Sequence, residues 1–351
     1  MPEGHTLHRL AQALDTAFAG TTPLVSSPQG RFVEGAALLD GREVVQATAW
    51  GKHLFLEFAG EQWLNVHLGL IGKFSVERLA TDGQGDAVVP PARGAVRVRL
   101  LTPVPGGYVA DLRGATVVQV VTPEEVEATI ERLGPDPLRP EAPQSDPERA
   151  WTRISRSGRT FAELLMDQSV LAGVGNVYRS EVLFRHRVNP FRPGKEIRRA
   201  TWQVIWDDLV RLMPIGVQFN QIITMDDQVE RAELLAEQGR VPELVSVHTD
   251  SARRATPGPA GIVKMVEVEE VETVSTVDTV ADLEDLDDEG VLADPEAAVG
   301  EGDGPGPAGM PRRYYVYRRQ GQACRVCGSK VRTQVVAGRN LFWCGRCQRR
   351  R

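Results

Sequence analysis

Two cysteine pairs near the C-terminal end, Cys324-Arg325-Val326-Cys327 and Cys344-Gly345-Arg346-Cys347, contain all four cysteines of this chain. A C-x2-C pair followed by a second C-x2-C pair at this distance is typical of a structural zinc ribbon. Four thiolates complete a tetrahedral shell and leave no open position, so we expect one structural Zn²⁺ here. Two disulfides are the alternative. The start of the chain does not resemble a secretory signal, and this favours zinc, because thiols inside cells stay reduced.

The residues around these cysteines predict a basic β-hairpin. Residues 332–336 and 338–343 are rich in β-branched and aromatic side chains and are predicted to be its two strands. A ribbon this small has no adequate core of its own, so the metal supplies its stability. Residues 311–351 carry twelve Lys/Arg and no Asp/Glu, interleaved with Tyr and Trp, which predicts contact with a polyanion. We therefore expect residues 311–351 to form a zinc finger.

The formal net charge of −6 conceals an uneven distribution of charge along the chain. Residues 265–310 carry fifteen Asp/Glu and no Lys/Arg, so the rest of the chain holds 41 basic and 32 acidic residues. Residues 225–310 are acidic, rich in Gly and Pro and poor in aromatic residues, which predicts a largely disordered insert without catalytic residues. The insert is either an electrostatic gate that competes with this polyanion for the basic surface or an inert spacer.

The first part of the chain predicts a helix followed by a β-sandwich. Leu7, Leu10, Ala11, Leu14 and Phe18 share one face of a helix. Residues 24–121 are predicted to be β-structure, because short β-rich segments at 53–58, 63–68, 96–100 and 116–121 are separated by Gly/Pro turns. A connecting helix is expected at 123–133. We expect residues 1–134 to form one domain, followed by a linker at 135–150.

Residues 151–224 predict a helical module, with candidate helices at 161–168, 176–186 and 201–213. Between the first two helices lies Gly173-Val174-Gly175-Asn176. Glycines let backbone amides approach a phosphate, and the start of the next helix adds a positive dipole end. The alternative is an ordinary corner between two helices. The whole chain is thus expected to be an α+β multidomain protein, and no apolar run is long enough to span a membrane.

The N-terminus offers a possible nucleophile. Methionine aminopeptidase removes Met1 before a small residue, and Pro2 would then carry a free secondary amine. An α-amino group has a pKa of about 8, so a useful fraction is neutral at pH 7 and can form a Schiff base. Glu3 beside it is a candidate proton carrier. The alternative is an inert, frayed terminus.

Taken together, these segments resemble the formamidopyrimidine-DNA glycosylase/endonuclease VIII family of base-excision repair enzymes, over nearly the whole chain except the acidic insert. Pro-Glu-Gly at the terminus points to the endonuclease VIII branch, and the sequence of residues 1–11 looks most like the actinobacterial form of that branch. The motifs that carry the resemblance are residues 2–4, 51–54, 67–72, 111–114, 133–138 and 167–178, and the ribbon preceded by Val316-Tyr317-Arg318.

The resemblance implies a helix–two-turn–helix module and two lobes with DNA crossing the cleft between them. It also implies bifunctional chemistry, in which an N-glycosylase step is followed by abasic-site lyase chemistry. Pro2 would attack C1′ of the damaged nucleotide, and Glu3 would protonate the opening sugar and then carry protons. Lys52 would contact phosphate and assist elimination, and Arg339 would grip phosphates. By local sequence alone, Lys52 is a solvated turn lysine and Arg339 is one of many ribbon arginines.

The resemblance also implies that the damaged base is flipped out of the duplex, because the enzyme cannot reach it inside the stack. Leu70 and Arg113 match the positions that fill the gap, although the apolar pair Leu70-Ile71 is otherwise a hairpin tip or core. The backbone phosphate would be held by Gly173, Gly175 and Asn176, and further DNA contacts would come from Tyr317 and Arg318. His67 is left open between a structural and a functional role, and His5 and His8 are expected on the helix surface.

We therefore expect a monomeric, cytoplasmic, nucleoid-associated enzyme that acts on double-stranded DNA with damaged bases or abasic sites. The alternative is a non-catalytic, zinc-containing DNA-damage-binding protein of the same fold. Oxidised pyrimidines are the favoured lesions. Oxidised purines stay open, because a loop that would contact them lies near residues 217–227. The sequence does not decide between β- and β,δ-elimination.

Overall fold

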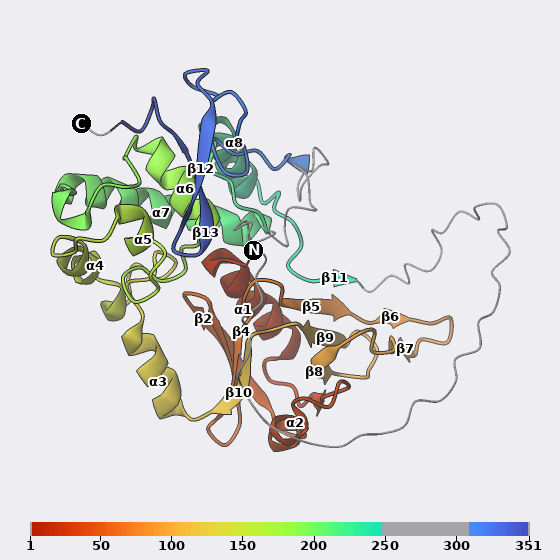
Figure 1. Ribbon diagram of the computed structural model, residues 1–351. Helices are drawn as coiled ribbons and strands as arrows, with labels where there is room; N and C mark the ends of the chain where they lie inside the picture. The colour runs from red at the N-terminus through yellow and green to blue at the C-terminus, as the bar shows by residue number, and fades with distance from the viewer. Residues whose placement is uncertain (1, 248–308, 350–351) are drawn as a thin grey trace, which may run out of the picture. The chain divides into compact units, whose positions relative to one another are not determined.

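The computed structural model describes residues 2–247 and 309–349 (Figure 1). Residues 248–308, which make up most of the predicted acidic insert, lie outside the described residues. The described residues fall into one compact unit, and its parts are presented below in chain order.

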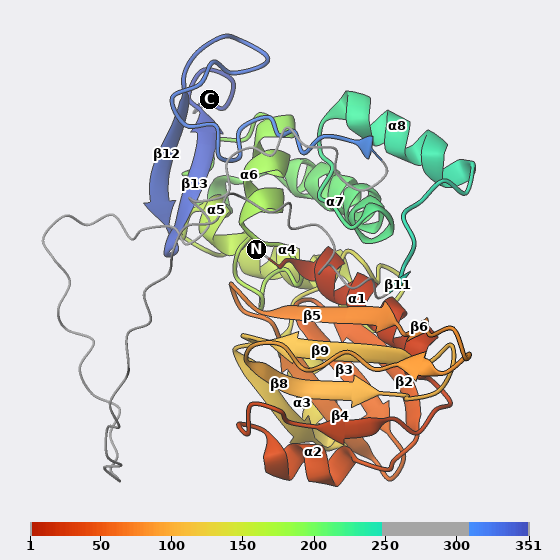
Figure 2. The same ribbon diagram turned by 90° about the vertical axis from the view of Figure 1, so that its right-hand side faces the viewer.

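The N-terminal part is a helix followed by two facing antiparallel sheets, as predicted. The helix α1 spans Gly4–Phe18 and packs against the second sheet and against α7. Figure 2 shows the first sheet face on, with β11 added in parallel beside β5. The first sheet has the order β1 (Leu24–Ser26), β8 (Val96–Leu101), β9 (Tyr108–Arg113), β5 (Lys73–Arg78) and β11 (Ser246–Val247), and the second has the order β10 (Val117–Val121), β4 (Gln62–His67), β3 (His53–Phe58) and β2 (Val44–Trp50).

Alternating apolar side chains close the space between the sheets. Leu54, Leu56, Val98 and Leu100 are at most 1% exposed, and the predicted apolar face of α1 covers the same core. The predicted strand at 53–58 has the observed bounds, and the other three predicted strands match to within one residue. The prediction omitted a short helix and a small hairpin: α2 (Val33–Leu39), β6 (Ala80–Thr81) and β7 (Ala87–Val88).

The segment predicted to be a linker, residues 135–150, is packed into the protein and in part helical. Helix α3 (Pro123–Arg132) begins at the predicted residue, and Thr122 before it forms a capping box with Glu125. The chain that follows is held inside the protein, since the Asp136 side chain is fully buried. A 3-10 turn at Pro143–Ser145 leads directly into α4, which spans Pro147–Ile154 and therefore starts before the expected helical boundary.

Two of the three predicted helices of the helical module differ by several residues in length from the prediction, and a fourth helix was not predicted. The first ends at Leu164, because Asp167 accepts hydrogen bonds from Ser169 and starts a turn. The third runs through Pro214 to Phe219 and ends on Asn220, which is in the left-handed conformation. Residues at the start of the predicted disordered insert instead form a helix against α7. The helices are α5 (Phe161–Leu164), α6 (Asn176–Arg185), α7 (Arg199–Phe219) and α8 (Asp226–Glu237).

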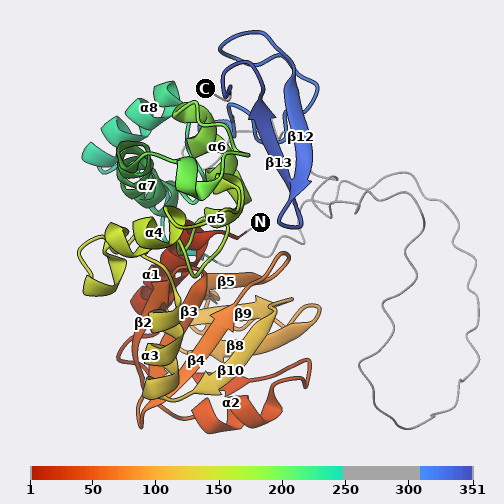
Figure 3. The same cartoon turned by 60° about the vertical axis from the view of Figure 1, so that its left-hand side comes forward.

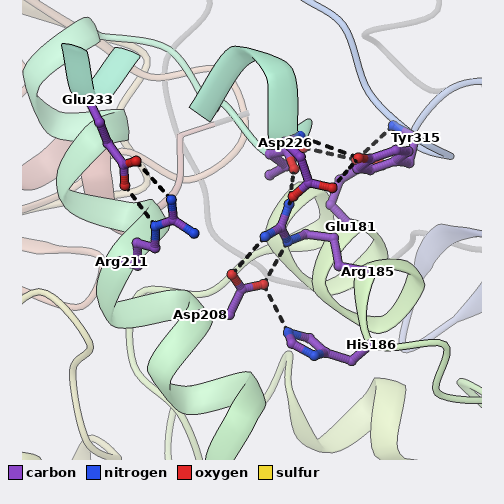
Figure 4. A network of polar contacts seen from close by, with 9 residues as sticks. Glu181, Arg185, His186, Asp208, Arg211, Asp226, Glu233 and Tyr315 are labelled. Atoms are coloured by element: carbon purple, nitrogen blue, oxygen red, sulfur yellow. Dashed lines mark hydrogen bonds and ion pairs between the residues drawn. The ribbon is translucent and has the colours of Figure 1, made fainter. Parts of the chain in front are cut away.

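A partly buried polar network joins α6, α7 and α8 to the segment that leads into the ribbon (Figure 4). Arg185 makes two hydrogen bonds to Asp208 and a third to Asp226. Glu181, fully buried, accepts hydrogen bonds from the backbone N–H groups of residues 315–317. These contacts fix the base of the ribbon on the helical module before the zinc site begins.

The ribbon is a two-stranded hairpin beside α6, as predicted (Figure 3). Strand β12 (Val331–Val336) pairs with β13 (Arg339–Cys344), and the turn between them lies near the N-terminal end of the chain in Figures 1 and 3. The ribbon shares one continuous core with the helical module, to which its residues Val331, Leu341, Phe342 and Trp343, among others, contribute.

Candidate active site

Glu3 lies at the start of α6 with its side chain fully buried. Its carboxylate accepts hydrogen bonds from the backbone N–H groups of Val177 at 2.7 Å, Gly175 at 2.9 Å and Tyr178 at 3.4 Å. Burial raises the pKa of Glu3, while Lys52 and these three N–H groups oppose the rise. The residue after Pro2 is thereby held in a fixed position on the positive end of a helix.

Two glycines make this close approach possible. A Cβ atom on Gly175 would lie 2.4 Å from the Glu3 carboxyl carbon, and one on Gly4 would lie 2.8 Å from the Gly173 Cα. The Gly4 N–H donates to the Gly173 carbonyl at 2.8 Å, which ties the first residues of α1 to the loop before α6. The N-terminus is thus anchored rather than frayed.

The groups of the predicted phosphate site in this loop make hydrogen bonds to other parts of the protein. The Gly175 N–H donates to Glu3, and the Gly173 N–H donates to Oε1 of Gln168 at 3.0 Å. Asn176 is buried, and its side-chain amide donates to the Asn340 carbonyl of the ribbon at 3.0 Å. These groups hold the Glu3 carboxylate and the ribbon in place, and DNA contact by Gly173, Gly175 and Asn176 stays a prediction.

Lys52 lies in the tight turn between β2 and β3, next to Gly51 in the left-handed conformation. The side chain is half-buried, and burial lowers the pKa of Lys52. Glu3 raises that pKa, while Arg339 and Arg179 lower it further. Lys52 is therefore close enough to Glu3 and to Arg339 for their charges to interact, and its role in elimination stays a prediction.

Arg179 is a site residue that the sequence analysis did not single out. Its side chain is fully buried on α6, it donates to the Val336 carbonyl of the ribbon at 3.2 Å, and it also bonds Oδ1 of Asn176. Burial lowers the pKa of Arg179 to about 10, and Glu3 opposes this. Arg339 follows the hairpin turn and interacts with both Arg179 and Lys52. Glu3, Lys52, Arg179 and Arg339 thus form one group of charges.

The two aromatic and basic residues before the ribbon have different environments. Tyr317 is only 5% exposed and packs edge-on against Phe342, so its side chain belongs to the core. Arg318 is half-buried and lies over the Tyr317 ring. A role in DNA contact therefore fits Arg318 better than Tyr317, and the assignment of both stays a prediction.

Leu70 lies in the loop before β5, and Arg113 ends β9, the strand that pairs with β5. In the loop between β4 and β5, Leu70 is 39% exposed and Ile71 is 68% exposed. Arg113 pairs in register with Lys73 at the start of β5, and its guanidinium donates to Asp111 and to the Arg93 carbonyl. Two exposed apolar side chains beside a braced arginine fit the predicted gap-filling role.

His67 has a structural role in this arrangement. Its Nδ1 accepts a hydrogen bond from the Gly69 N–H at 3.1 Å, directly before Leu70. Burial lowers the pKa of His67 to about 4, with further lowering from His53 and Lys52. A neutral His67 therefore supports the start of the Leu70 loop.

His5 and His8 are not on the helix surface, contrary to the prediction. His5 is 6% exposed and packs edge-on against Tyr178, because α1 is covered by α7 on this side. His8 donates from Nε2 to the buried Asp136 at 3.1 Å. The apolar stripe alone could not predict this, since the contacts come from segments far along the chain.

The protein is expected to lose stability below pH 6.5 through His5. Burial lowers the pKa of His5 to about 3 from an ordinary 6.5, so the unfolded chain takes up a proton that the folded chain does not. Between pH 6.5 and pH 5 this lowers the free energy of unfolding by about 2 kcal/mol. The loss of unfolding free energy between pH 7.5 and pH 5, measured by denaturant titration, should be smaller by about this amount in His5→Phe than in the wild type. An unchanged difference would contradict this assignment.

The four cysteine thiols form one cluster. Their Sγ atoms lie within 4.8 Å of one another, with Cys324–Cys347 at 3.9 Å and Cys327–Cys344 at 3.4 Å. Tetrahedral zinc with Zn–S bonds of about 2.3 Å places sulfurs about 3.8 Å apart, so the cluster fits the metal. All four cysteines are free, which excludes the two-disulfide alternative in this structure. The cluster is therefore a site for one structural Zn²⁺.

Across residues 2–247 and 309–349, every helix is too short or too polar to pass through a lipid bilayer.

Three family models match successive parts of the chain. The formamidopyrimidine-DNA glycosylase N-terminal domain matches residues 1–116, its H2TH domain matches residues 133–228, and the zinc finger found in FPG and IleRS matches residues 321–350. These matches coincide with the sandwich, the helical module and the ribbon.

Known proteins resemble the chain over almost its whole length. Endonuclease 8 1 of Mycobacterium tuberculosis is 39% identical over 99% of this chain and 100% of its own length. The crystal structure of MutM (Fpg) from Thermus thermophilus has a TM-score of 0.60 at 21% identity, covering 99% of this chain and 98% of that one. Lactococcus lactis Fpg in complex with DNA containing an abasic site has a TM-score of 0.62 at 15% identity, covering 99% and 100%. With its buried glutamate after Pro2, its helical module and its zinc ribbon, the chain belongs to the formamidopyrimidine-DNA glycosylase/endonuclease VIII family of DNA-repair glycosylases and lyases.

Proposed function

We propose that this protein excises oxidised bases from double-stranded DNA, with oxidised pyrimidines favoured, and then cleaves the strand at the resulting abasic site. The observation that carries the proposal is the position of Glu3, which is fixed on the N-terminus of α6 directly after Pro2 and interacts with Lys52. This chemistry needs a nucleophilic amine, a proton carrier and a lysine. Here the amine of Pro2 directly precedes the proton carrier Glu3, which belongs to the same group of charges as Lys52.

The Pro2 nitrogen forms a bond to C1′ while the bond from C1′ to the damaged base breaks, and the proton that the amine loses goes to the departing base. Glu3 donates a proton to the ring oxygen as the sugar opens, which leaves an iminium between Pro2 and C1′. Burial raises the pKa of Glu3, which makes its carboxyl a better proton carrier than an exposed glutamate. The resulting carboxylate then accepts a proton from C2′, and the 3′ phosphate leaves by β-elimination. Lys52 and Arg339 stabilise the departing phosphate.

The preference for pyrimidines is supported by the segment after α7. The sequence placed a possible purine-contacting loop near residues 217–227, but Ile222, Ile223 and Thr224 are buried there. The Thr224 hydroxyl donates to Glu181, and the Thr224 carbonyl accepts from Arg185. A segment anchored in this way has few groups available for a purine lesion.

A panel of duplexes tests the proposal, each with one defined lesion: an oxidised pyrimidine, an oxidised purine or an abasic site. We expect excision of the oxidised pyrimidines to be at least about tenfold faster than excision of the oxidised purine, and strand cleavage at the abasic site without prior glycosylase action. The end groups of the products on a gel report whether elimination stops at β or continues to δ. Purines excised faster than pyrimidines would contradict the lesion preference, and no excision of any lesion would contradict the activity.

The activity implies damaged duplex DNA as partner. We expect the protein to act as a monomer, because each residue assigned to the chemistry comes from this one chain. We expect it to act in the cytoplasm, at the nucleoid, where its DNA substrate lies.

A further inference from the structure

We propose that Asp136 and His8 are positioning residues that hold the Lys52 turn in the geometry needed for elimination. This inference rests on the proposed lyase function of Lys52. It concerns two residues that make no contact with DNA in the mechanism above.

Asp136 is a fully buried carboxylate that connects three segments. Its Oδ2 accepts a hydrogen bond from the Gly51 N–H at 2.7 Å and another from Nε2 of His8 at 3.1 Å. Its Oδ1 accepts from the Leu138 N–H at 2.9 Å. One side chain therefore connects the residue directly before Lys52 with the helix that follows Glu3.

The turn that Asp136 holds has little freedom of its own. Gly51 adopts a φ of +55°, and a Cβ atom there would lie 3.1 Å from the Ala172 side chain. The Ala172 N–H donates to the Pro135 carbonyl at 3.0 Å, so the residue before Asp136 also braces the loop before α6. Gly51, directly before Lys52, thus lies between the carboxylate of Asp136 and the loop on which Glu3 rests.

The contact depends on the charge of Asp136. Burial by itself raises the pKa of a carboxyl, but His8 and the N–H groups of Gly51 and Leu138 lower the pKa of Asp136 below its ordinary value. An ionised carboxylate only accepts hydrogen bonds, so Nε2 of His8 carries the proton that it donates. Charge-assisted hydrogen bonds are roughly twice as strong as neutral ones, which explains a buried charge at this position.

Loss of this contact should slow elimination more than it slows Schiff-base formation. Asp136→Asn keeps the size of the side chain, but its NH₂ group would face one of the N–H donors. The backbone bonds of Pro135 and Gly4, which position the loop and Glu3, remain. A misplacement of about 1 Å in a catalytic group costs about 100-fold in rate. We expect elimination to fall about 10- to 100-fold, with the Pro2 adduct still formed.

The test uses the full-length protein with zinc, in excess over a duplex with one abasic site. Four proteins are compared: wild type, Asp136→Asn, His8→Asn and His8→Gln. The amide of Gln reaches the position of Nε2 in His8 and can donate to Asp136, whereas the amide of Asn is too short. Borohydride trapping measures the adduct, and single-turnover strand cleavage measures elimination. We expect slow elimination with normal trapping in Asp136→Asn and His8→Asn, and near wild-type elimination in His8→Gln.

Leu100→Ala is the matched structural control, because Leu100 is fully buried in the sandwich away from these contacts. It should lower the melting temperature, and any change in the trapped adduct should be matched by an equal change in the elimination rate. Wild-type elimination in both Asp136→Asn and His8→Asn would overturn the inference, as would a parallel loss of trapping and elimination. If Asp136→Asn does not fold, the comparison of His8→Asn with His8→Gln decides alone. Failure of the wild type to trap at all would instead contradict the proposed function.

Discussion

Protein with Met1 or a tag still attached to Pro2 is expected to form no borohydride-trapped complex with abasic-site DNA. The Pro2 nitrogen would then be part of a tertiary amide, whose electron pair is delocalised into the carbonyl and is not nucleophilic. Glycosylase and lyase rates should both fall at least about 1,000-fold, the scale expected when a covalent nucleophile is removed. The measurement compares one preparation before and after a protease releases Pro2 at the terminus.

Pro2→Gly is the matched control, because it keeps a free α-amine after Met1 is removed. This variant should still trap DNA, although more slowly, since a primary amine on a flexible glycine is less well positioned. The blocked protein must also bind abasic-site duplex about as well as the released protein, which separates loss of the nucleophile from loss of binding. Equal trapping by blocked and released protein would show that a lysine is the nucleophile and that the assignment of Pro2 is wrong.

Local patterns predicted the elements of the fold well. The strand at 53–58 has the predicted bounds, because its apolar residues are β-rich and glycine turns stand on both sides. The cysteine spacing predicted the zinc site for a similar reason, since C-x2-C fixes the ligand geometry within a few residues. Helix ends were predicted less well. Helix α7 continues through Pro214, where tertiary packing of Met213 and Ile215 outweighs one missing hydrogen bond.

The contacts that build the site could not be predicted from local patterns. The amides at 175–178 suit a phosphate or a carboxylate equally well, and the sequence does not say that Glu3, 172 residues away, reaches the Gly175 amide. The bond between His8 and Asp136 spans 128 residues and is equally invisible to helical periodicity. The acidic composition after residue 225 predicted disorder, but Val229 and Ala232 give α8 a buried face against the helical core.

Removal of the zinc should abolish tight DNA binding and lower elimination about 100-fold or more, while the sandwich stays folded. A two-stranded hairpin is at best marginally stable alone, whereas zinc contributes about 10–16 kcal/mol of binding free energy to such modules. The hairpin supplies Arg339, and its carbonyls at Val336 and Asn340 accept hydrogen bonds from Arg179 and Asn176. Without the hairpin, the buried charge of Arg179 loses one of its partners next to Glu3, so the damage extends into the site.

The prediction is tested with Cys324→Ser and with chelated wild-type protein, by metal analysis, DNA affinity and hydrogen exchange. Amides of β12 and β13 should lose protection, and those of β3 and β4 should keep it, because the sandwich has a separate core. Part of the helical module should also loosen, since Leu341 and Phe342 belong to its core. Arg339→Ala is the matched control: it should keep zinc and the hairpin while losing part of the affinity and much of the elimination rate. A zinc-free protein with full affinity would contradict the assignment, because the ribbon would then be dispensable for placing Arg339 on the DNA.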